Sequence, residues 1–130
     1  MERVEKQDVL VVEDEDLILM MLEDTLSEGG FSVIPARNGV EAISLLETPD
    51  NQPVAIITDI RLGDLSGWAV AKHAREKVPQ IAVVYVTGDS AMDWPANGVP
   101  NSVCIQKPFA PAQILVAIAN QLNVDQPPRA

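Results

Sequence analysis

The chain has 130 residues, a length that suits one ordinary domain with a sizeable core. It carries 19 acidic and 9 basic residues, and the resulting net charge of −10 disfavours nonspecific binding to nucleic acid or to an anionic membrane. The single cysteine, Cys104, excludes an internal disulfide, and no run is apolar for long enough to form a signal peptide or a membrane span. Composition therefore predicts a soluble, cytoplasmic protein that binds neither nucleic acid nor membranes.

Short runs rich in β-branched residues alternate with helix-patterned segments along the chain. Several of these runs are continuously apolar, as a parallel strand covered on both faces requires. Strict alternation of strand and helix predicts a parallel sheet with helices on both faces and right-handed crossovers. The fold class is thus α/β, a doubly wound sheet of five parallel strands. The predicted strands are 8–12, 31–36, 54–58, 81–87 and 102–106, and the predicted helices begin near Glu15, Asn38, Ser66, Ser90 and Pro111.

The limits of the first helix and of the domain are also predicted. Gly29 and Gly30 stand where the first helix should end. The last segment, "NVDQPPRA", is polar and contains two adjacent prolines. We therefore expect residues 8–122 to form the domain, with residues 1–7 as an N-terminal lead and residues 123–130 as a tail.

Polar residues follow four of the five predicted strands. Glu13 and Asp14 follow the first strand, Asp59 the third, and Thr87 ends the fourth, while Lys107 follows the fifth. In a doubly wound sheet, functional groups gather outside the carboxyl ends of the strands, near the point where the strand order reverses. Three acids, a hydroxyl and an amine are therefore expected to converge.

The chemistry of this set is that of a metal-assisted phosphoryl transfer. Mg²⁺ prefers oxygen ligands, and the carboxylates of Glu13, Asp14 and Asp59 fit that preference. A carboxylate beside such a metal can attack a phosphoryl group and hold it as an acyl phosphate. Lys107 and Thr87 would then bind the phosphoryl oxygens, because a positive charge and a hydrogen-bond donor neutralise the charge that develops there.

The segments "VVEDE", "IITDIRLGDLSGW", "YVTGDS" and "QKPFAP" occur in this order along the chain. From residue 8 to about residue 122, the chain resembles the receiver domain of the response regulators of bacterial two-component systems. The resemblance implies a flavodoxin-like fold in which Asp59 accepts a phosphoryl group from a histidine kinase or a histidine phosphotransfer protein.

The resemblance also implies a role for each residue of the site. Glu13, Asp14 and Asp59 would hold Mg²⁺ together with the backbone carbonyl of Arg61. The phosphoryl group would be bound by Thr87, Gly88 and Lys107, with Thr87 as the switch hydroxyl, and the Lys107–Pro108 peptide bond is expected to be cis.

The sequence departs from the family pattern at several positions. Gly63 replaces a common proline in the loop after the phosphoacceptor, and should loosen that loop. Arg61 and Asp89 occupy two variable positions that flank the phosphoryl group, where an ion pair between them would screen it from water. The fourth helix is about one turn shorter than usual, and Pro95 must lie in its first turn. Cys104 replaces the usual Tyr or Phe switch residue, and should be a small buried residue.

Of four candidate signalling or phosphatase functions, the sequence favours the first. The first is a single-domain response regulator, which is not an enzyme but assists its own phosphorylation and dephosphorylation and signals by binding an unidentified downstream protein. The second is a phosphate sink or relay, and the third is an unphosphorylated pseudo-receiver. The fourth, a haloacid-dehalogenase-type phosphatase, requires a second Asp where this chain has Arg61. A flavodoxin that binds flavin mononucleotide would need a phosphate-binding loop where this chain has Glu13 and Asp14.

Two helices are expected to expose apolar surface. Residues 17–22 are all apolar, which exceeds the stripe that one buried helix face needs. The last helix contains no charged residue over 111–122, and an exposed patch there would favour a homodimer. The resemblance implies that the first helix docks the phosphodonor, whereas a generous core explains both patterns equally well.

Overall fold

Five parallel strands form a single sheet in the computed structural model, which describes residues 6–124. The order across the sheet is β2-β1-β3-β4-β5, so the order reverses between β1 and β3. All four pairings are parallel. This confirms the predicted α/β doubly wound fold. The strands are β1 (Gln7–Val12), β2 (Phe31–Ala36), β3 (Ala55–Asp59), β4 (Ala82–Thr87) and β5 (Ser102–Gln106).

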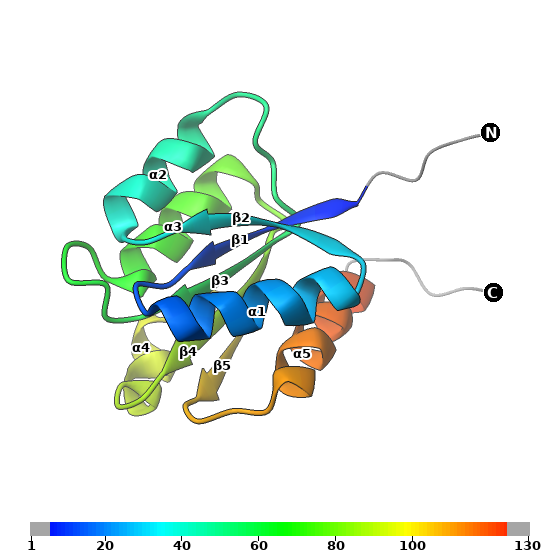
Figure 1. The fold of residues 1–130 in the computed structure, drawn as a ribbon. Helices are drawn as coiled ribbons and strands as arrows, with labels where there is room; N and C mark the ends of the chain where they lie inside the picture. Colours follow the sequence, from blue (N-terminus) through cyan, green and yellow to red (C-terminus); the bar gives the residue numbers. More distant parts are fainter. Residues whose placement is uncertain (1–5, 125–130) are drawn as a thin grey trace, which may run out of the picture.

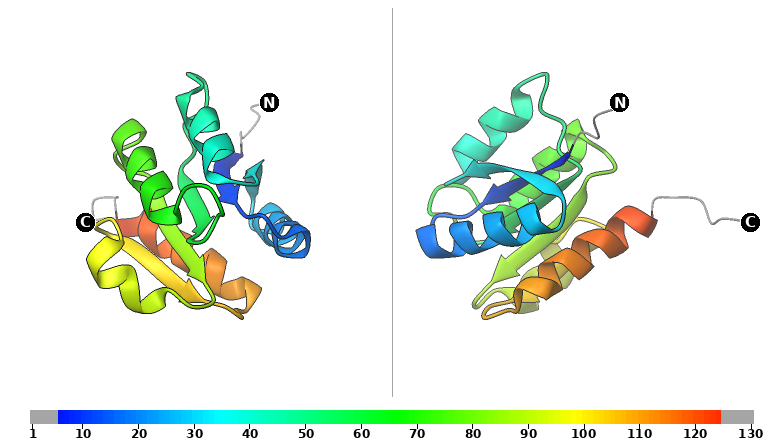
Figure 2. Two further views of the ribbon diagram at one scale, coloured as in Figure 1. Left: turned by 90° about the vertical axis from the view of Figure 1, so that its left-hand side faces the viewer. Right: turned by 45° about the vertical axis from the view of Figure 1, so that its right-hand side comes forward.

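Helices cover both faces of this sheet (Figure 1). Helices α1 and α5 lie on one face, and α2, α3 and the short α4 lie on the other (Figures 1 and 2). The carboxyl ends of the strands, on the left of Figure 1, face the viewer in the left view of Figure 2. The helices are α1 (Asp16–Glu28), α2 (Gly39–Glu47), α3 (Gly67–Lys77), α4 (Trp94–Asn97) and α5 (Pro111–Val124), and a 3-10 turn, η1 (Ala91–Asp93), precedes α4.

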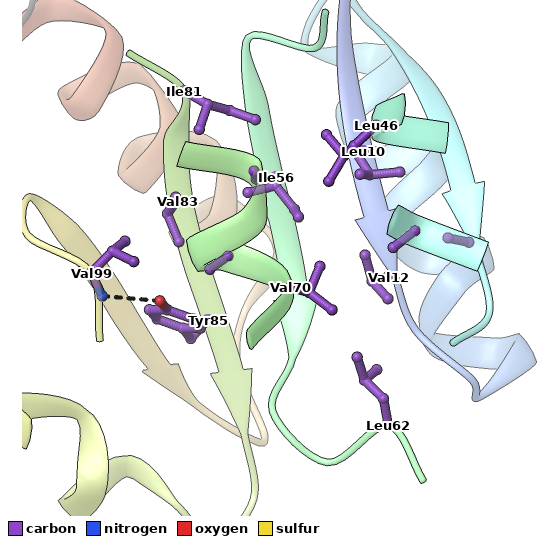
Figure 3. Close-up of a cluster of buried hydrophobic side chains, with 14 of the residues drawn as sticks. Leu10, Val12, Leu46, Ile56, Leu62, Val70, Ile81, Val83, Tyr85 and Val99 are labelled. Atoms are coloured by element: carbon purple, nitrogen blue, oxygen red, sulfur yellow. Dashed lines mark hydrogen bonds between the residues drawn. The ribbon is translucent and has the colours of Figure 1, made fainter. Parts of the chain in front are cut away.

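Each face of the sheet has its own apolar core, because the strands are buried on both sides. Alternate strand residues point to opposite faces. Leu10 and Ile56 therefore pack under α2 and α3, whereas Val11 and Ile57 pack under α1 and α5. Figure 3 shows the first of these cores, which also contains Tyr85 and Val99.

The helix ends carry the signals that the sequence contains. The Asn38 side chain accepts a hydrogen bond from Glu41 N–H at the start of α2, and Ser66 accepts one from Ala69 N–H at the start of α3. Helix α1 stops at Glu28, followed by Gly29 and by Gly30 at φ +94°. Glycine adopts this left-handed conformation without steric cost, so the predicted helix end is confirmed.

Several boundaries differ by one or two residues from those predicted: β3 ends at Asp59, and β4 begins at Ala82. Strand β1 begins at Gln7, inside the predicted lead, and α5 extends to Val124, two residues into the predicted tail. The remaining residues of the lead and the tail, 1–5 and 125–130, lie outside the described part of the chain. Within residues 6–124, no helix has the length and hydropathy needed to cross a bilayer.

The fourth helical segment is short, as expected. It consists of the three-residue turn η1 and the four-residue α4, with Pro95 in the first turn of α4. A proline is tolerated there because a first-turn N–H has no partner within the helix. None of the residues 91–97 is buried. This segment is therefore held to the domain by few apolar contacts.

Candidate functional site

Four neighbouring strands deliver the predicted polar residues to one edge of the sheet. Because β1 pairs with β3, β3 with β4, and β4 with β5, their carboxyl ends lie side by side. Beyond the last paired residues, Lys107 N–H donates to the carbonyl of Thr87 at 2.7 Å, which places Lys107 next to the end of β4. The site thus lies at the reversal of strand order, where ligands bind in such sheets.

The three acids of the site form one cluster. One carboxylate oxygen from each of Glu13, Asp14 and Asp59 lies within 4.8 Å of the others. Glu13 is fully buried, Asp59 is 8% exposed, and Asp14 is exposed. Three carboxylates this close repel one another unless a cation compensates their charge. An all-oxygen set of this kind suits a small hard cation such as Mg²⁺.

Lys107 supplies one positive charge to this cluster. Its Nζ donates to Asp59 Oδ2 at 2.9 Å and to Glu13 Oε1 at 3.4 Å. Burial alone would lower the pKa of the Lys107 ammonium group, but the hydrogen bond to Asp59 and the charges of Glu13 and Asp59 outweigh it and raise the pKa. Lys107 therefore stays protonated at neutral pH, beside the predicted phosphoacceptor.

The carboxyl group of Glu13 is held in an unfavourable environment for a charge. Burial raises the pKa of Glu13, and the neighbouring Asp59 charge adds to that effect. The N–H of Glu15, which donates to Glu13 Oε2 at 3.0 Å, and the Lys107 charge oppose it without cancelling it. A bound cation would favour the ionised form of Glu13, so the site is electrostatically suited to one.

Thr87 lies at the end of β4 with its hydroxyl already positioned. Its Oγ1 accepts hydrogen bonds from Asp89 N–H at 3.2 Å and from Ser90 N–H at 2.9 Å. A threonine hydroxyl has one donor and two acceptor sites, so these bonds leave its O–H free to donate. Gly88 follows in open space, where a Cβ would meet no atom within 4 Å.

The loop after β3 carries Arg61 beside Asp59. Arg61 N–H donates to Asp59 Oδ1 at 3.2 Å, and its guanidinium forms an ion pair with Asp89 at 3.1 Å. The predicted Arg61–Asp89 pair is therefore present. Gly63 adopts φ +86°, a conformation that proline, fixed near −65°, cannot take. The replacement of proline by glycine thus changes the shape of this loop and does not only loosen it.

Cys104 differs from the expectation of a small buried residue. It is only partly buried, because β5 is the edge strand of the sheet. Burial still raises the pKa of the Cys104 thiol, so the thiol is not activated at neutral pH. Cys104 lies opposite Tyr85 in the pairing of β4 with β5. The predicted cis geometry of the Lys107–Pro108 bond is confirmed.

Two residues of the site were not predicted. Ser90 is buried, and its Oγ donates to Asp89 Oδ1 at 2.9 Å, which orients the partner of Arg61. Thr87 is the local signal for Ser90, because a threonine shortly before a helical turn often accepts hydrogen bonds from the first N–H groups of that turn. Asp64 caps a helix that is distant in sequence, and no local pattern indicates which helix that is.

Comparison with known proteins gives the family of this fold and site. The family model described as "Response regulator receiver domain" matches residues 9–119. The chain belongs to this family. The structure of a response regulator receiver protein from Sinorhizobium medicae WSM419 superimposes on this receiver domain with a TM-score of 0.90 and 36% sequence identity, covering 94% of this chain and 98% of that one.

Curated relatives of this receiver domain differ in length. The alginate biosynthesis transcriptional regulatory protein AlgB of Pseudomonas aeruginosa is 34% identical over 120 residues, which are 91% of this chain but 26% of AlgB. The polar-differentiation response regulator DivK of Brucella anthropi is 29% identical over 120 residues, which are 88% of this chain and 95% of DivK. The chain therefore spans about a quarter of AlgB and nearly all of DivK.

Proposed function

We propose that this receiver domain accepts a phosphoryl group on Asp59 from a phosphohistidine of a histidine kinase or a histidine phosphotransfer protein. One observation carries the proposal: the Lys107 ammonium group lies 2.9 Å from an Asp59 carboxylate that also belongs to a three-acid cluster. A nucleophile, a cation-binding set and a fixed positive charge are thereby combined at one edge of the sheet.

Each group has a defined part in the transfer. A carboxylate oxygen of Asp59 attacks the phosphorus atom and forms a P–O bond, while the P–N bond breaks and its electron pair leaves with the imidazole. Lys107 neutralises charge on the phosphoryl oxygens, and Thr87 O–H and Gly88 N–H donate hydrogen bonds to them. Water later hydrolyses the acyl phosphate. The protein thus assists its own phosphorylation and dephosphorylation without being a classical enzyme.

Mg²⁺ is the cofactor that this donor set fits. We assign its protein ligands to the carboxylates of Glu13, Asp14 and Asp59 and to the backbone carbonyl of Arg61. When bound, the ion supplies positive charge to the phosphoryl oxygens during the transfer. The support for this assignment is the all-oxygen cluster with its oxygens within 4.8 Å, together with the buried Glu13 carboxyl group.

The phosphodonor has an exposed apolar surface available beside the site. On α1, which directly follows Glu13 and Asp14, Leu17 is 81% exposed and Met20 is 58% exposed. On this basis, α1 is the proposed docking surface for the helices of the phosphodonor. On α5, Val116 is 57% exposed, and a homodimer through that helix or a contact with a downstream protein would cover it.

Other functions are less well supported. A pseudo-receiver would not need the complete set of Glu13, Asp14, Asp59 and Lys107. A haloacid-dehalogenase-type phosphatase would need a second acid two residues after the nucleophile, where Arg61 forms an ion pair with Asp89. A phosphate sink uses the same chemistry as a signalling receiver and differs only in the partner that follows.

The proposal is tested by phosphorylation with Mg²⁺ and acetyl phosphate, a small acyl phosphate donor. The intact protein should gain one phosphate that hydroxylamine removes, as it does from acyl phosphates. Asp59→Asn should abolish the gain, and Lys107→Ala should slow it because a positive charge beside the phosphoryl oxygens is lost. A phosphate that maps to serine or threonine would contradict the proposed mechanism.

A further inference from the structure

The loop between β3 and α3 is closed at its base. Arg61 and Ser66 form an isolated antiparallel bridge, and Gly67 N–H donates to the carbonyl of Ile60 at 2.8 Å. The two arms lie so close that a Cβ on Gly67 would come within 2.2 Å of the backbone oxygen of Asp59. The loop therefore leaves β3 and returns to it as one compact unit that contains Arg61.

The tip of this loop is fixed by a distant helix. Asp64 Oδ1 accepts a hydrogen bond from Gly39 N–H and Asp64 Oδ2 accepts one from Val40 N–H, both at 3.0 Å, and both donors belong to the first turn of α2. Asp64 Oδ1 also accepts Leu65 N–H at 2.6 Å. The backbone N–H groups of Val40, Gly39 and Leu65 lower the pKa of Asp64. The carboxylate is therefore charged at neutral pH and lies at the positive end of the helix dipole.

Packing between the same two segments supports this contact independently. A Cβ built on Gly39 would lie 2.6 Å from the Cβ of Leu65 and 3.2 Å from Asp64 Oδ1. Only a residue without a side chain allows the loop to approach α2 this closely. The sequence separation of about 25 residues shows that the contact joins two different βα units.

The fixed loop acts directly on the phosphoacceptor. Arg61 N–H donates to Asp59 Oδ1 at 3.2 Å, so the position of the loop determines the orientation of that carboxylate. The second oxygen, Oδ2, accepts from Lys107 Nζ. A shift of the loop would therefore rotate or release the Asp59 carboxylate relative to Lys107. The same shift would move the backbone of Arg61.

We propose that Asp64 is a positioning residue of the site, because it anchors the β3–α3 loop to the N-terminus of α2 and thereby fixes the Asp59 carboxylate through Arg61. The proposal rests on the proposed function. It assigns a role in phosphorylation to a residue that does not touch the phosphoryl group. In the first turn of α2, Gly39 and Val40 N–H then bond to Asp64, whereas Glu41 N–H bonds to the local cap Asn38.

Asn38 provides the matched control. Asn38→Ala and Asp64→Ala both remove side-chain acceptors from the first turn of α2, so both should lower the melting temperature. Only Asp64→Ala also releases the loop that carries Arg61. Gly39→Ala tests the same contact from the helix side. Alanine normally favours a helix over glycine, yet here it should displace Leu65 and Asp64.

The experiment measures the Mg²⁺ dissociation constant from tryptophan fluorescence and the rate of acyl phosphate formation with acetyl phosphate, in the full chain. Asp64→Ala and Gly39→Ala should each weaken Mg²⁺ binding and slow phosphorylation by about tenfold, the lower end of the effect of losing an outer partner of a metal ligand. Asp64→Asn retains one acceptor oxygen, so its Mg²⁺ affinity and phosphorylation rate should lie between those of Asp64→Ala and those of the wild type. Asn38→Ala should leave both quantities within about twofold of wild type, as expected for a partly buried side chain that caps only Glu41 N–H.

Two results would overturn the proposal. In one, Asp64→Ala folds and matches Asn38→Ala in Mg²⁺ affinity and in phosphorylation rate, so Asp64 is only a helix cap. In the other, Asn38→Ala and Asp64→Ala impair both quantities equally, so helix stability is the common cause. A wild-type protein that gains no phosphate would instead refute the proposed function, while the Mg²⁺ measurement would still test the anchor.

Discussion

Tyr85 and Val99 form a buried hydrogen bond that joins β4 to the loop before β5. Val99 N–H donates to the Tyr85 hydroxyl at 3.1 Å (Figure 3), and the Tyr85 side chain has no exposed surface. The Tyr85 ring also packs on Trp68, with the ring centres 4.7 Å apart. An aromatic ring thus lies two residues before Thr87, on β4, opposite the position where Cys104 replaces the aromatic residue of the family pattern on β5.

Two further hydrogen bonds connect Val99 to the short fourth helix. Ser102 Oγ donates to the carbonyl of Val99 at 2.6 Å and accepts from Trp94 Nε1 at 2.9 Å. Tyr85→Phe would leave the buried Val99 N–H without an acceptor, and should lower the free energy of unfolding by about 1–3 kcal/mol. Urea denaturation measures this change. Trp94→Phe removes the half-buried hydrogen bond to Ser102 and should lower the free energy of unfolding by less. Equal stability of Tyr85→Phe and wild type would show that the Tyr85–Val99 bond contributes nothing.

The segment 88–101 should carry the response to phosphorylation. It contains η1 and α4, none of whose residues is buried, and it is joined to β4 through the Tyr85–Val99 bond. Such weakly packed segments have low local stability, so the phosphoryl group can shift their populations. Amide hydrogen exchange with and without the phosphoryl mimic beryllofluoride should change over 88–101. If other surfaces responded and this segment did not, the proposed route would be wrong. If Cys104→Tyr left every response identical, position 104 would have no part in it.

Magnesium should stabilise the fold by binding the native acid cluster. At a free Mg²⁺ concentration ten times the dissociation constant, mass action adds about 1.4 kcal/mol, or a rise of about 4–6 °C in melting temperature. Asp14→Asn removes one ligand, and should abolish the rise at the same concentration. Trp68 reports binding by fluorescence, and Trp94→Phe isolates its signal. An unchanged melting temperature and fluorescence at millimolar Mg²⁺ would refute the metal site.

The Arg61–Asp89 ion pair should influence the lifetime of the acyl phosphate and not the stability of the fold. Both side chains are more than half exposed, so breaking the pair should change stability by less than about 1 kcal/mol. If the pair screens the phosphoryl group, Arg61→Ala, Asp89→Ala and the double variant should all hydrolyse faster by the same factor, about 2–10 for a coupled pair. Loss of phosphorylated protein after removal of the donor measures this rate. Additive effects would show that the two side chains act separately.

Glu47 should make stability depend on pH near the acid end of the range. It joins α2 to α3 through Lys77 at 2.8 Å and His73 at 2.7 Å. The hydrogen bond from Lys77, and then that from His73, lowers the pKa of Glu47 below its ordinary value of 4.5. A pKa that is lower in the folded state contributes stability above pH 4.5, and that stability is lost as the pH falls through the folded-state value. The melting-temperature difference between wild type and Glu47→Gln should therefore be present at pH 7 and shrink as the pH falls below 4.5. A difference that grows on acidification would contradict this assignment.

The sequence by itself determined the fold class and the residues of the acid–lysine cluster. Continuous apolar runs alternating with helical patterns require parallel strands, and parallel strands place all their carboxyl ends at one edge. Asp59 ends β3, and Glu13, Asp14 and Lys107 directly follow their strands, so the convergence of these four residues needed no further information. The Arg61–Asp89 pair was predicted from the resemblance to receiver domains, in which these two positions flank the phosphoryl group, and the structure contains it.

The tertiary structure alone decided which distant groups meet around this cluster. Asp64 binds the first turn of α2, and Tyr85 binds Val99, although nothing near these residues in sequence specifies a partner. A buried hydroxyl or a helix N-terminus needs a hydrogen-bond partner, and any suitable group that the packing brings close can provide it. The choice depends on how loops and helices from separate βα units pack together. The relative positions of the strand ends do not depend on this packing, because the pairing of the strands in the sheet sets them.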